Sequence, residues 1–140
     1  MGKIAVIGGG TMGLGIGQAF AKKNYDVLIR DVDDATIQAS EERLVKELDR
    51  LVSKGKMDRA EQVDILAHMT FTTDLSMAGD ADLVVEAAVE NLDIKRIIFG
   101  ELDKLCKPET VLATNTSSIS ITAIATATKR PDKCIGMHFF

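Results

Sequence analysis

Three glycines near the N-terminus have the spacing of a loop that binds phosphate. Gly8, Gly10 and Gly13 lie within GGGTMG, directly after a β-branched run that is typical of a buried strand. The first glycine allows a sharp turn, the second lets the backbone approach a pyrophosphate, and the third lets a helix pack closely on the strand. Because the free N–H groups and positive dipole of that helix would face an anion, the pattern predicts phosphate binding.

Asp31 supplies a second part of the same site. It ends the next predicted strand, where a carboxylate can accept hydrogen bonds from both ribose hydroxyls. Loop, helix and acid together predict a dinucleotide site that includes the loop residues Gly9, Thr11 and Met12. A carboxylate would repel a 2′-phosphate, so NAD is favoured over NADP, although the neighbouring Arg30 could turn toward such a phosphate. S-adenosylmethionine and flavin proteins share parts of this pattern, and a turn that serves only packing is a further alternative.

Short apolar runs alternate along the chain with segments of helical periodicity. We expect strands at residues 3–8, 25–31, 69–74, 82–89, 110–115 and 133–140, and helices at 12–23, 33–54, 58–66, 91–105 and 120–127. Strands that alternate with helices pair in parallel. The expected fold class is therefore α/β, a doubly wound Rossmann sheet that is mostly parallel, with a helical hairpin inserted after the second strand. Residues 1–140 are expected to form one nucleotide-binding domain.

Polar residues follow three of the later strands, where a doubly wound sheet binds its ligands. They lie in VEAAVEN, ATNTSS and GMHFF. Each has a structural alternative. Glu90 and Lys95 could form an ion pair on a helix surface. Asn115 and Ser117 could cap a helix, and His138 could be a hydrogen-bonded core residue.

In combination these segments point to a family. VVEAAVENLDIK, ATNTSSISIT and RPDKCIGMHFF, in that order behind GGGTMGLGI, resemble the NAD-binding domain of the L-3-hydroxyacyl-CoA dehydrogenases, and the bacterial 3-hydroxybutyryl-CoA dehydrogenases in particular. The resemblance covers residues 3–140. It implies an oxidoreductase that uses NAD to interconvert (S)-3-hydroxybutyryl-CoA and acetoacetyl-CoA, in fatty-acid or butanoate metabolism. An enzyme of the same fold that acts on another 3-hydroxy acid is an alternative.

The resemblance implies contacts with the cofactor. Residues 8–13 and Asp31 would contact the pyrophosphate and the adenosine ribose. Glu90 and Lys95 would approach the nicotinamide half of NAD, and Asn115 is expected to contact the cofactor as well.

The resemblance also implies a catalytic pair. His138 would be the base, because a histidine can shuttle the hydroxyl proton near neutral pH while hydride moves to the nicotinamide. Ser117 would contact both cofactor and substrate and hold the reacting oxygen. Lys54 would touch the coenzyme A end of the substrate, but a solvated surface lysine is an equal alternative.

Members of this family continue beyond the histidine into a helical domain, which supplies the carboxylate that orients the histidine, most of the acyl pocket and the dimer interface. We therefore expect these 140 residues to bind NAD but to be catalytically incomplete, and the full-length protein to be a homodimer or larger. A stand-alone NAD-binding sensor or regulatory module without catalysis is the alternative.

Composition limits the remaining classes. The formal net charge is −4, and Lys and Arg are scattered, which argues against nucleic-acid binding. No apolar run is long enough for a transmembrane helix, and we expect no metal site. Cys106 and Cys134 lack a CxxC arrangement and are expected to be buried thiols in a cytoplasmic protein.

Overall fold

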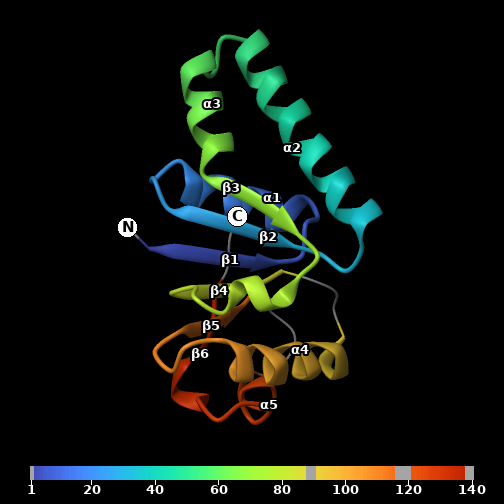
Figure 1. Ribbon diagram of the computed structural model, residues 1–140, viewed down its shortest axis with the longest axis vertical. Coiled ribbons are helices and arrows are strands. Elements are labelled where there is room, and N and C mark those ends of the chain that lie inside the picture. The colour runs from blue at the N-terminus through green and yellow to red at the C-terminus, as the bar shows by residue number, and fades with distance from the viewer. Residues whose placement is uncertain (1, 88–90, 116–120, 138–140) are drawn as a thin grey trace.

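A computed structural model describes residues 2–87, 91–115 and 121–137. The described residues form a six-stranded parallel sheet of order β3-β2-β1-β4-β5-β6 (Figure 1). The strands are β1 (Lys3–Ile7), β2 (Asp26–Arg30), β3 (Met69–Thr72), β4 (Leu83–Glu86), β5 (Val111–Thr114) and β6 (Cys134–Gly136). The helices are α1 (Thr11–Ala21), α2 (Asp34–Ser53), α3 (Arg59–Ala67), α4 (Leu92–Leu105) and α5 (Ile121–Ala125), with short 3₁₀ turns η1 (Leu75–Ala78) and η2 (Pro131–Lys133). The predicted doubly wound α/β fold is confirmed.

The order of the strands reverses at β1. The chain builds outward from β1 through β2 to β3, and then returns to place β4 on the other side of β1. Ile7 at the end of β1 therefore pairs with both Arg30 of β2 and Glu86 of β4. A reversal of this kind leaves a crevice at the carboxyl ends of the strands, which is where doubly wound sheets bind ligands.

Helices cover both faces of the sheet, as the alternation of side chains in β1 requires. Val6 faces a core that includes residues of α1, α2 and α3, whereas Ile7 faces a core that includes residues of α4 and α5. Both side chains are almost fully buried. The apolar run of β1 is thus explained by burial on two sides, as in other parallel sheets.

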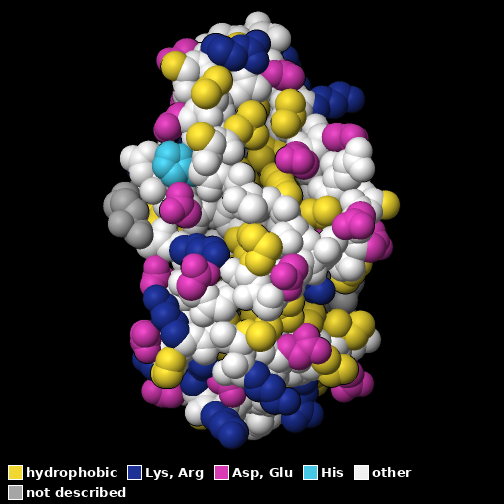
Figure 2. Space-filling view, viewed as in Figure 1, with side chains coloured by type: hydrophobic (Ala, Val, Ile, Leu, Met, Phe, Trp, Pro, Cys, Tyr) yellow, Lys and Arg dark blue, Asp and Glu magenta, His cyan; other side chains and the backbone are white. Residues whose placement is uncertain are grey.

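Helices α2 and α3 lie side by side beyond the β3 edge of the sheet (Figure 1). Asp33 and Asp58 cap their N-termini by accepting hydrogen bonds from backbone N–H groups. Asp49 of α2 accepts hydrogen bonds from Gln62 Nε2 at 2.7 Å and from Arg59 Nη1 at 3.1 Å, both on α3. On the face shown in Figure 2, hydrophobic side chains collect between the two helices, and charges of both signs are interspersed elsewhere.

Arg130 ties the C-terminus of α4 to the segment that precedes β6. Its guanidinium donates to the Asp103 carboxylate at 2.6 Å and to four backbone carbonyls, those of Asp103, Cys106, Lys107 and Thr110. Burial alone would raise the pKa of the Asp103 carboxyl, but hydrogen bonds from the Lys129 N–H and from Arg130 outweigh it and hold the pKa below its ordinary value of 3.8. The stabilisation from this carboxylate is therefore complete above that value and is lost as the pH falls through the lowered pKa.

We predict that Arg130→Met lowers the free energy of unfolding by about 3 kcal/mol, because it leaves a mostly buried carboxylate and several helix-end carbonyls without their donor. Urea denaturation followed by circular dichroism would measure the loss. Arg50→Met is the matched control, since Arg50 pairs with Glu47 on the exposed surface of α2 and such pairs contribute little. Equal losses in the two variants would contradict the anchoring role.

Candidate functional site

The glycine loop joins β1 to α1 in a shape that depends on its glycines. Gly8 has a φ angle of +118°, which side-chain-bearing residues rarely adopt. Its N–H donates to the Arg30 carbonyl at 2.8 Å, so the pairing of β1 with β2 continues into the loop. A Cβ at Gly13 would run into the carbonyl group of Gly8, because α1 starts directly against the loop. The third glycine is therefore required by close packing, as the sequence predicts.

The N-terminus of α1 is open toward a ligand. A Cβ at Gly10 would meet no atom within 4 Å, and Gly10, the N-cap residue, makes no side-chain cap. Thr11 is the first residue of the helix, and the Met12 side chain is about half exposed. Uncapped N–H groups at a helix start suit an anion such as a pyrophosphate.

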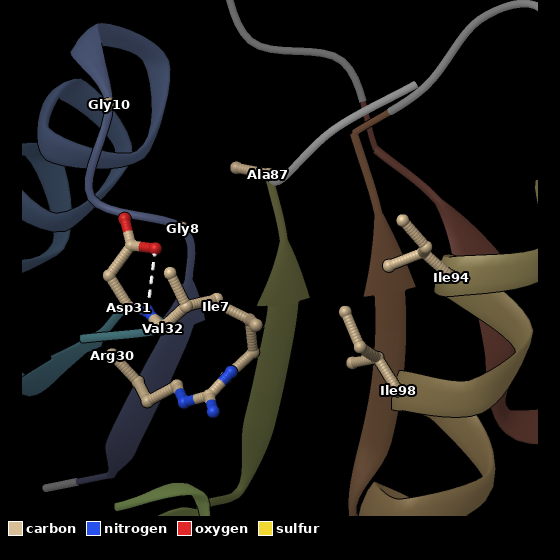
Figure 3. Close-up of a pocket in the computed structure, with 9 residues that line it drawn as sticks. All are labelled: Ile7, Gly8, Gly10, Arg30, Asp31, Val32, Ala87, Ile94 and Ile98. Carbon is tan, nitrogen blue, oxygen red and sulfur yellow. Dashed lines mark hydrogen bonds between the residues drawn. The ribbon is translucent and has the colours of Figure 1, made fainter. Parts of the chain in front are cut away.

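Asp31 connects the end of β2 to this loop. Its Oδ2 accepts a hydrogen bond from the Gly9 N–H at 2.8 Å, and its Oδ1 accepts one from the Val32 N–H at 2.8 Å. Figure 3 marks the second of these bonds and shows the carboxylate beside the glycine loop. The structure therefore brings together the two parts of the predicted dinucleotide site.

A cleft of about 480 Å³ opens at this point between β1, β2 and β4 (Figure 3). Asp31 and the loop form one wall, and Ile94 and Ile98 of α4 form the wall opposite. The full lining consists of Ile7, Gly8, Gly10, Arg30, Asp31, Val32, Ala87, Ile94 and Ile98. A mostly apolar cleft with a carboxylate at one side has the chemistry needed for a flat base and its ribose.

Arg30 is one of the residues that line the cleft. Its Nε donates to the Thr73 carbonyl at 3.1 Å, which fixes the side chain along the β3 side of the sheet. The alternative that Arg30 turns toward a phosphate would require this bond to break.

A buried ion pair lies at the same edge of the sheet. Lys95 Nζ of α4 and Glu86 Oε1 of β4 are 2.5 Å apart, and both side chains have an exposed fraction of 1% or less. Thr114 of β5 donates its hydroxyl to the same oxygen at 2.8 Å, and the Asn115 N–H donates to the Glu86 carbonyl at 2.8 Å. Glu86 thus links two strands to the start of the helix that follows the site.

Sequence reasoning missed Glu86 and placed Lys95 differently. Among the described residues, Lys95 does not line the cleft, and its ammonium group faces Glu86. The surface ion pair considered for this helix is wrong for Lys95, because Lys95 is buried. A carboxylate inside the otherwise apolar run LVVEAAV was the available signal for a buried partner.

The remaining predicted residues are placed as follows. Lys54 is exposed at the C-cap of α2 and is not part of the cleft lining. Glu90, Ser117 and His138 lie outside the described residues. Cys106 and Cys134 are buried free thiols, as predicted, and burial raises the pKa of both, so they are neutral.

The part of the chain that the structure describes contains no cluster of three or more metal-ligating side chains. None of its helices has the length and apolarity to cross a membrane.

Comparison with known proteins decides the family. The family model described as "3-hydroxyacyl-CoA dehydrogenase, NAD binding domain" matches residues 3–140. The chain belongs to this family. NAD is accordingly its cofactor, and the resemblance drawn from the sequence is confirmed.

Individual relatives agree with this assignment. The chain is 51% identical over 138 residues to a 3-hydroxybutyryl-CoA dehydrogenase of Clostridioides difficile, covering 99% of this chain and 49% of the relative. The solved (S)-3-hydroxybutyryl-CoA dehydrogenase of Ralstonia eutropha superposes with a TM-score of 0.94 at 40% identity, covering 99% and 49%. FadB2 of Mycobacterium tuberculosis superposes with a TM-score of 0.95 at 44% identity, covering 98% and 48%. The chain spans about half the length of these relatives.

We predict that Asp31→Ala raises the dissociation constant for NAD at least about tenfold, because hydrogen bonds to a charged group are among the stronger ones. Isothermal titration calorimetry would measure it. Asp26→Ala is the control, since Asp26 is an exposed carboxylate at the opposite end of the same strand. Unchanged NAD binding in Asp31→Ala would contradict the ribose contact.

We predict that Lys95→Met destabilises the domain by about 3 kcal/mol, because it leaves a buried carboxylate without its cation. The double variant Glu86→Gln/Lys95→Met should recover most of this loss, since neither partner is then charged. Urea denaturation of both single variants and the double variant completes a double-mutant cycle. Penalties that simply add would contradict the coupling.

Proposed function

We propose that this chain is the cofactor-binding part of an enzyme that interconverts (S)-3-hydroxybutyryl-CoA and acetoacetyl-CoA with NAD. The observation that carries the proposal is the cleft at the reversal of the sheet, where Asp31 is hydrogen-bonded into the glycine loop. Relatives named 3-hydroxybutyryl-CoA dehydrogenase at 51% and 44% identity support the choice of substrate. Because the chain spans about half of these relatives, the complete reaction is assigned to the longer protein.

The described residues fit the adenosine half of NAD. We assign the pyrophosphate to the N-terminus of α1, where Gly10 leaves the backbone uncovered. The ribose hydroxyls would donate to Asp31, and the adenine ring would lie against Ile94 and Ile98. Each of these groups is already in place without rearrangement of the sheet, which lowers the entropic cost of binding.

The nicotinamide half of NAD would be bound at the other end of the sheet edge, near β4 and β5. We propose that Glu90 and Asn115 contact this half of the cofactor. Lys95 would act through its buried pair with Glu86, which fixes the ends of β4 and β5 relative to α4. A site of this kind benefits from rigid support, because hydride transfer needs close control of distance and angle.

The reaction requires one base and one group that orients the oxygen. Bound NAD supplies the hydride acceptor. We propose that His138 removes the proton from the substrate hydroxyl, and that Ser117 donates a hydrogen bond to the same oxygen as it becomes a carbonyl. In the reverse direction the protonated His138 returns the proton to that oxygen. Lys54, exposed at the end of α2, would meet the negatively charged coenzyme A end of the substrate.

The wider context follows from the same family assignment. We propose that the full-length protein is a homodimer or larger assembly that works in the cytoplasm, in fatty-acid or butanoate metabolism. We also propose that the 140 residues alone bind NAD but turn over acetoacetyl-CoA slowly, because family members complete their sites with a second domain.

The test joins these 140 residues to the C-terminal half of the Clostridioides difficile relative. Oxidation of NADH by acetoacetyl-CoA, followed at 340 nm, should be robust in the chimera and weak in the 140 residues alone. His138→Gln in the chimera should lower kcat by about 10²- to 10⁴-fold, the usual contribution of a general base, while NADH still binds.

His68→Gln serves as the matched control, since His68 lies at the end of α3 and is the other histidine of the chain. A chimera that binds NADH but is equally active with and without His138 would contradict the catalytic assignment. NADH binding with no turnover of any 3-oxoacyl-CoA would favour the sensor alternative.

A further inference from the structure

A second cavity adjoins Asp31 on the side of α2. It has a volume of about 360 Å³ and shares Gly10 and Asp31 with the nucleotide cleft. Its lining consists of Gly9, Gly10, Asp31, Ala35, Thr36, Ala39, Ser40 and Arg43. A ribose held by Asp31 would therefore lie between the two cavities. The apolar wall that suits a base lies in the larger cleft. With the base placed there, the smaller cavity would lie beside the ribose hydroxyls.

Arg43 supplies a positive charge to this smaller cavity. Its Nη1 donates to the Gly9 carbonyl at 3.3 Å, and Ser40 Oγ donates to the same oxygen at 2.7 Å. The guanidinium makes no other hydrogen bond or ion pair within the described ranges, so its remaining N–H groups are available. Glu47, one turn further along α2, forms its ion pair with Arg50 at 2.5 Å, and among the described residues no ion pair joins it to Arg43. A guanidinium with free N–H groups is well suited to bind a phosphate.

We propose that this cavity, with Arg43 as its cation, is a subsite for a phosphate on the ribose 2′-oxygen, so that the domain binds NADP(H) as a second and weaker cofactor. The proposal rests on the assignment of the ribose to Asp31. In dinucleotide-binding folds an acidic residue favours the free 2′-hydroxyl, whereas a nearby arginine accommodates the 2′-phosphate. Here Asp31 and Arg43 line one cavity, so Asp31 would repel a 2′-phosphate while Arg43 would attract it.

The balance between them sets the order of affinities. Asp31 already accepts hydrogen bonds from two backbone N–H groups, which fix the position of its carboxylate. A 2′-phosphate would therefore meet a negative charge that cannot easily turn away. Arg30 cannot relieve this repulsion from its present position, since it lies in the other cleft and is bonded to Thr73. Arg43 is therefore the residue on which any affinity for NADP depends.

Calorimetric titration of the 140-residue chain with NAD, NADP, 5′-AMP and adenosine 2′,5′-bisphosphate tests the proposal. The unchanged chain should bind NADP about 10- to 100-fold more weakly than NAD. Arg43→Gln should weaken binding of NADP and of the bisphosphate about tenfold, and should leave NAD and 5′-AMP within about twofold. Asp31→Asn should strengthen NADP binding and weaken NAD binding, because it removes the repulsion and one strong acceptor.

Lys46→Gln is the matched control, since it removes one positive charge from an exposed position of the same helix. Lys46→Gln should leave the affinities for both NAD and NADP unchanged. If Arg43→Gln weakens NAD and NADP equally, Arg43 only supports the loop at Gly9 and the subsite is refuted. Absence of NADP binding in both the unchanged chain and Asp31→Asn would also refute it. In both of these cases retained NAD binding leaves the proposed function intact, whereas loss of NAD binding in the unchanged chain would overturn that function itself.

Discussion

The peptide of Gly9 is held from both sides, and the nucleotide site depends on this restraint. Its N–H donates to Asp31 at the end of β2, and its carbonyl accepts from the buried Ser40 hydroxyl of α2 at 2.7 Å. The loop between β1 and α1 therefore has its shape before any ligand arrives. This arrangement fixes the direction in which α1 presents its N-terminus, and it places a carboxylate where a ribose would lie. One hydrogen bond thus connects the proposed phosphate-binding and ribose-binding parts of the site.

A buried ion pair connects the elements at the other half of the sheet edge. Glu86 and Lys95 are removed from water almost completely, and burying such a pair costs much of the energy that their attraction returns. A buried ion pair is therefore weak evidence for added stability. Its geometry instead joins β4, β5 and α4 at the edge proposed to bind the cofactor, where precise placement matters most. The two halves of the edge are thus held by different means: side chains bonded to the Gly9 peptide near β2, and a buried ion pair between β4 and α4.

Much of this architecture could be predicted from the sequence because its signals are local. The apolar run of β1, the spacing of Gly8, Gly10 and Gly13, and the acid that ends β2 each lie within a short segment. The helix from residue 33 to 54 was expected within about one residue of its observed bounds, because Asp33 is a good N-cap and Leu44 and Leu48 repeat on one face.

The remaining features depend on contacts between distant segments. Neither the carbonyls that Arg130 contacts nor the approach of Arg43 to Gly9 has a pattern in the neighbouring residues. The burial of Lys95 depends on Glu86, which lies on a strand, so the spacing of the helix alone indicates an exposed lysine. These positions become clear only after the sheet order is known.

The most direct test of the central claim is a crystal structure of this chain with NAD. The account predicts that both hydroxyls of the adenosine ribose lie within hydrogen-bond distance of Asp31, that the pyrophosphate lies over Gly10, and that the adenine ring packs against Ile94 and Ile98. A nucleotide bound elsewhere on the sheet, or bound in this cleft with its ribose away from Asp31, would contradict it.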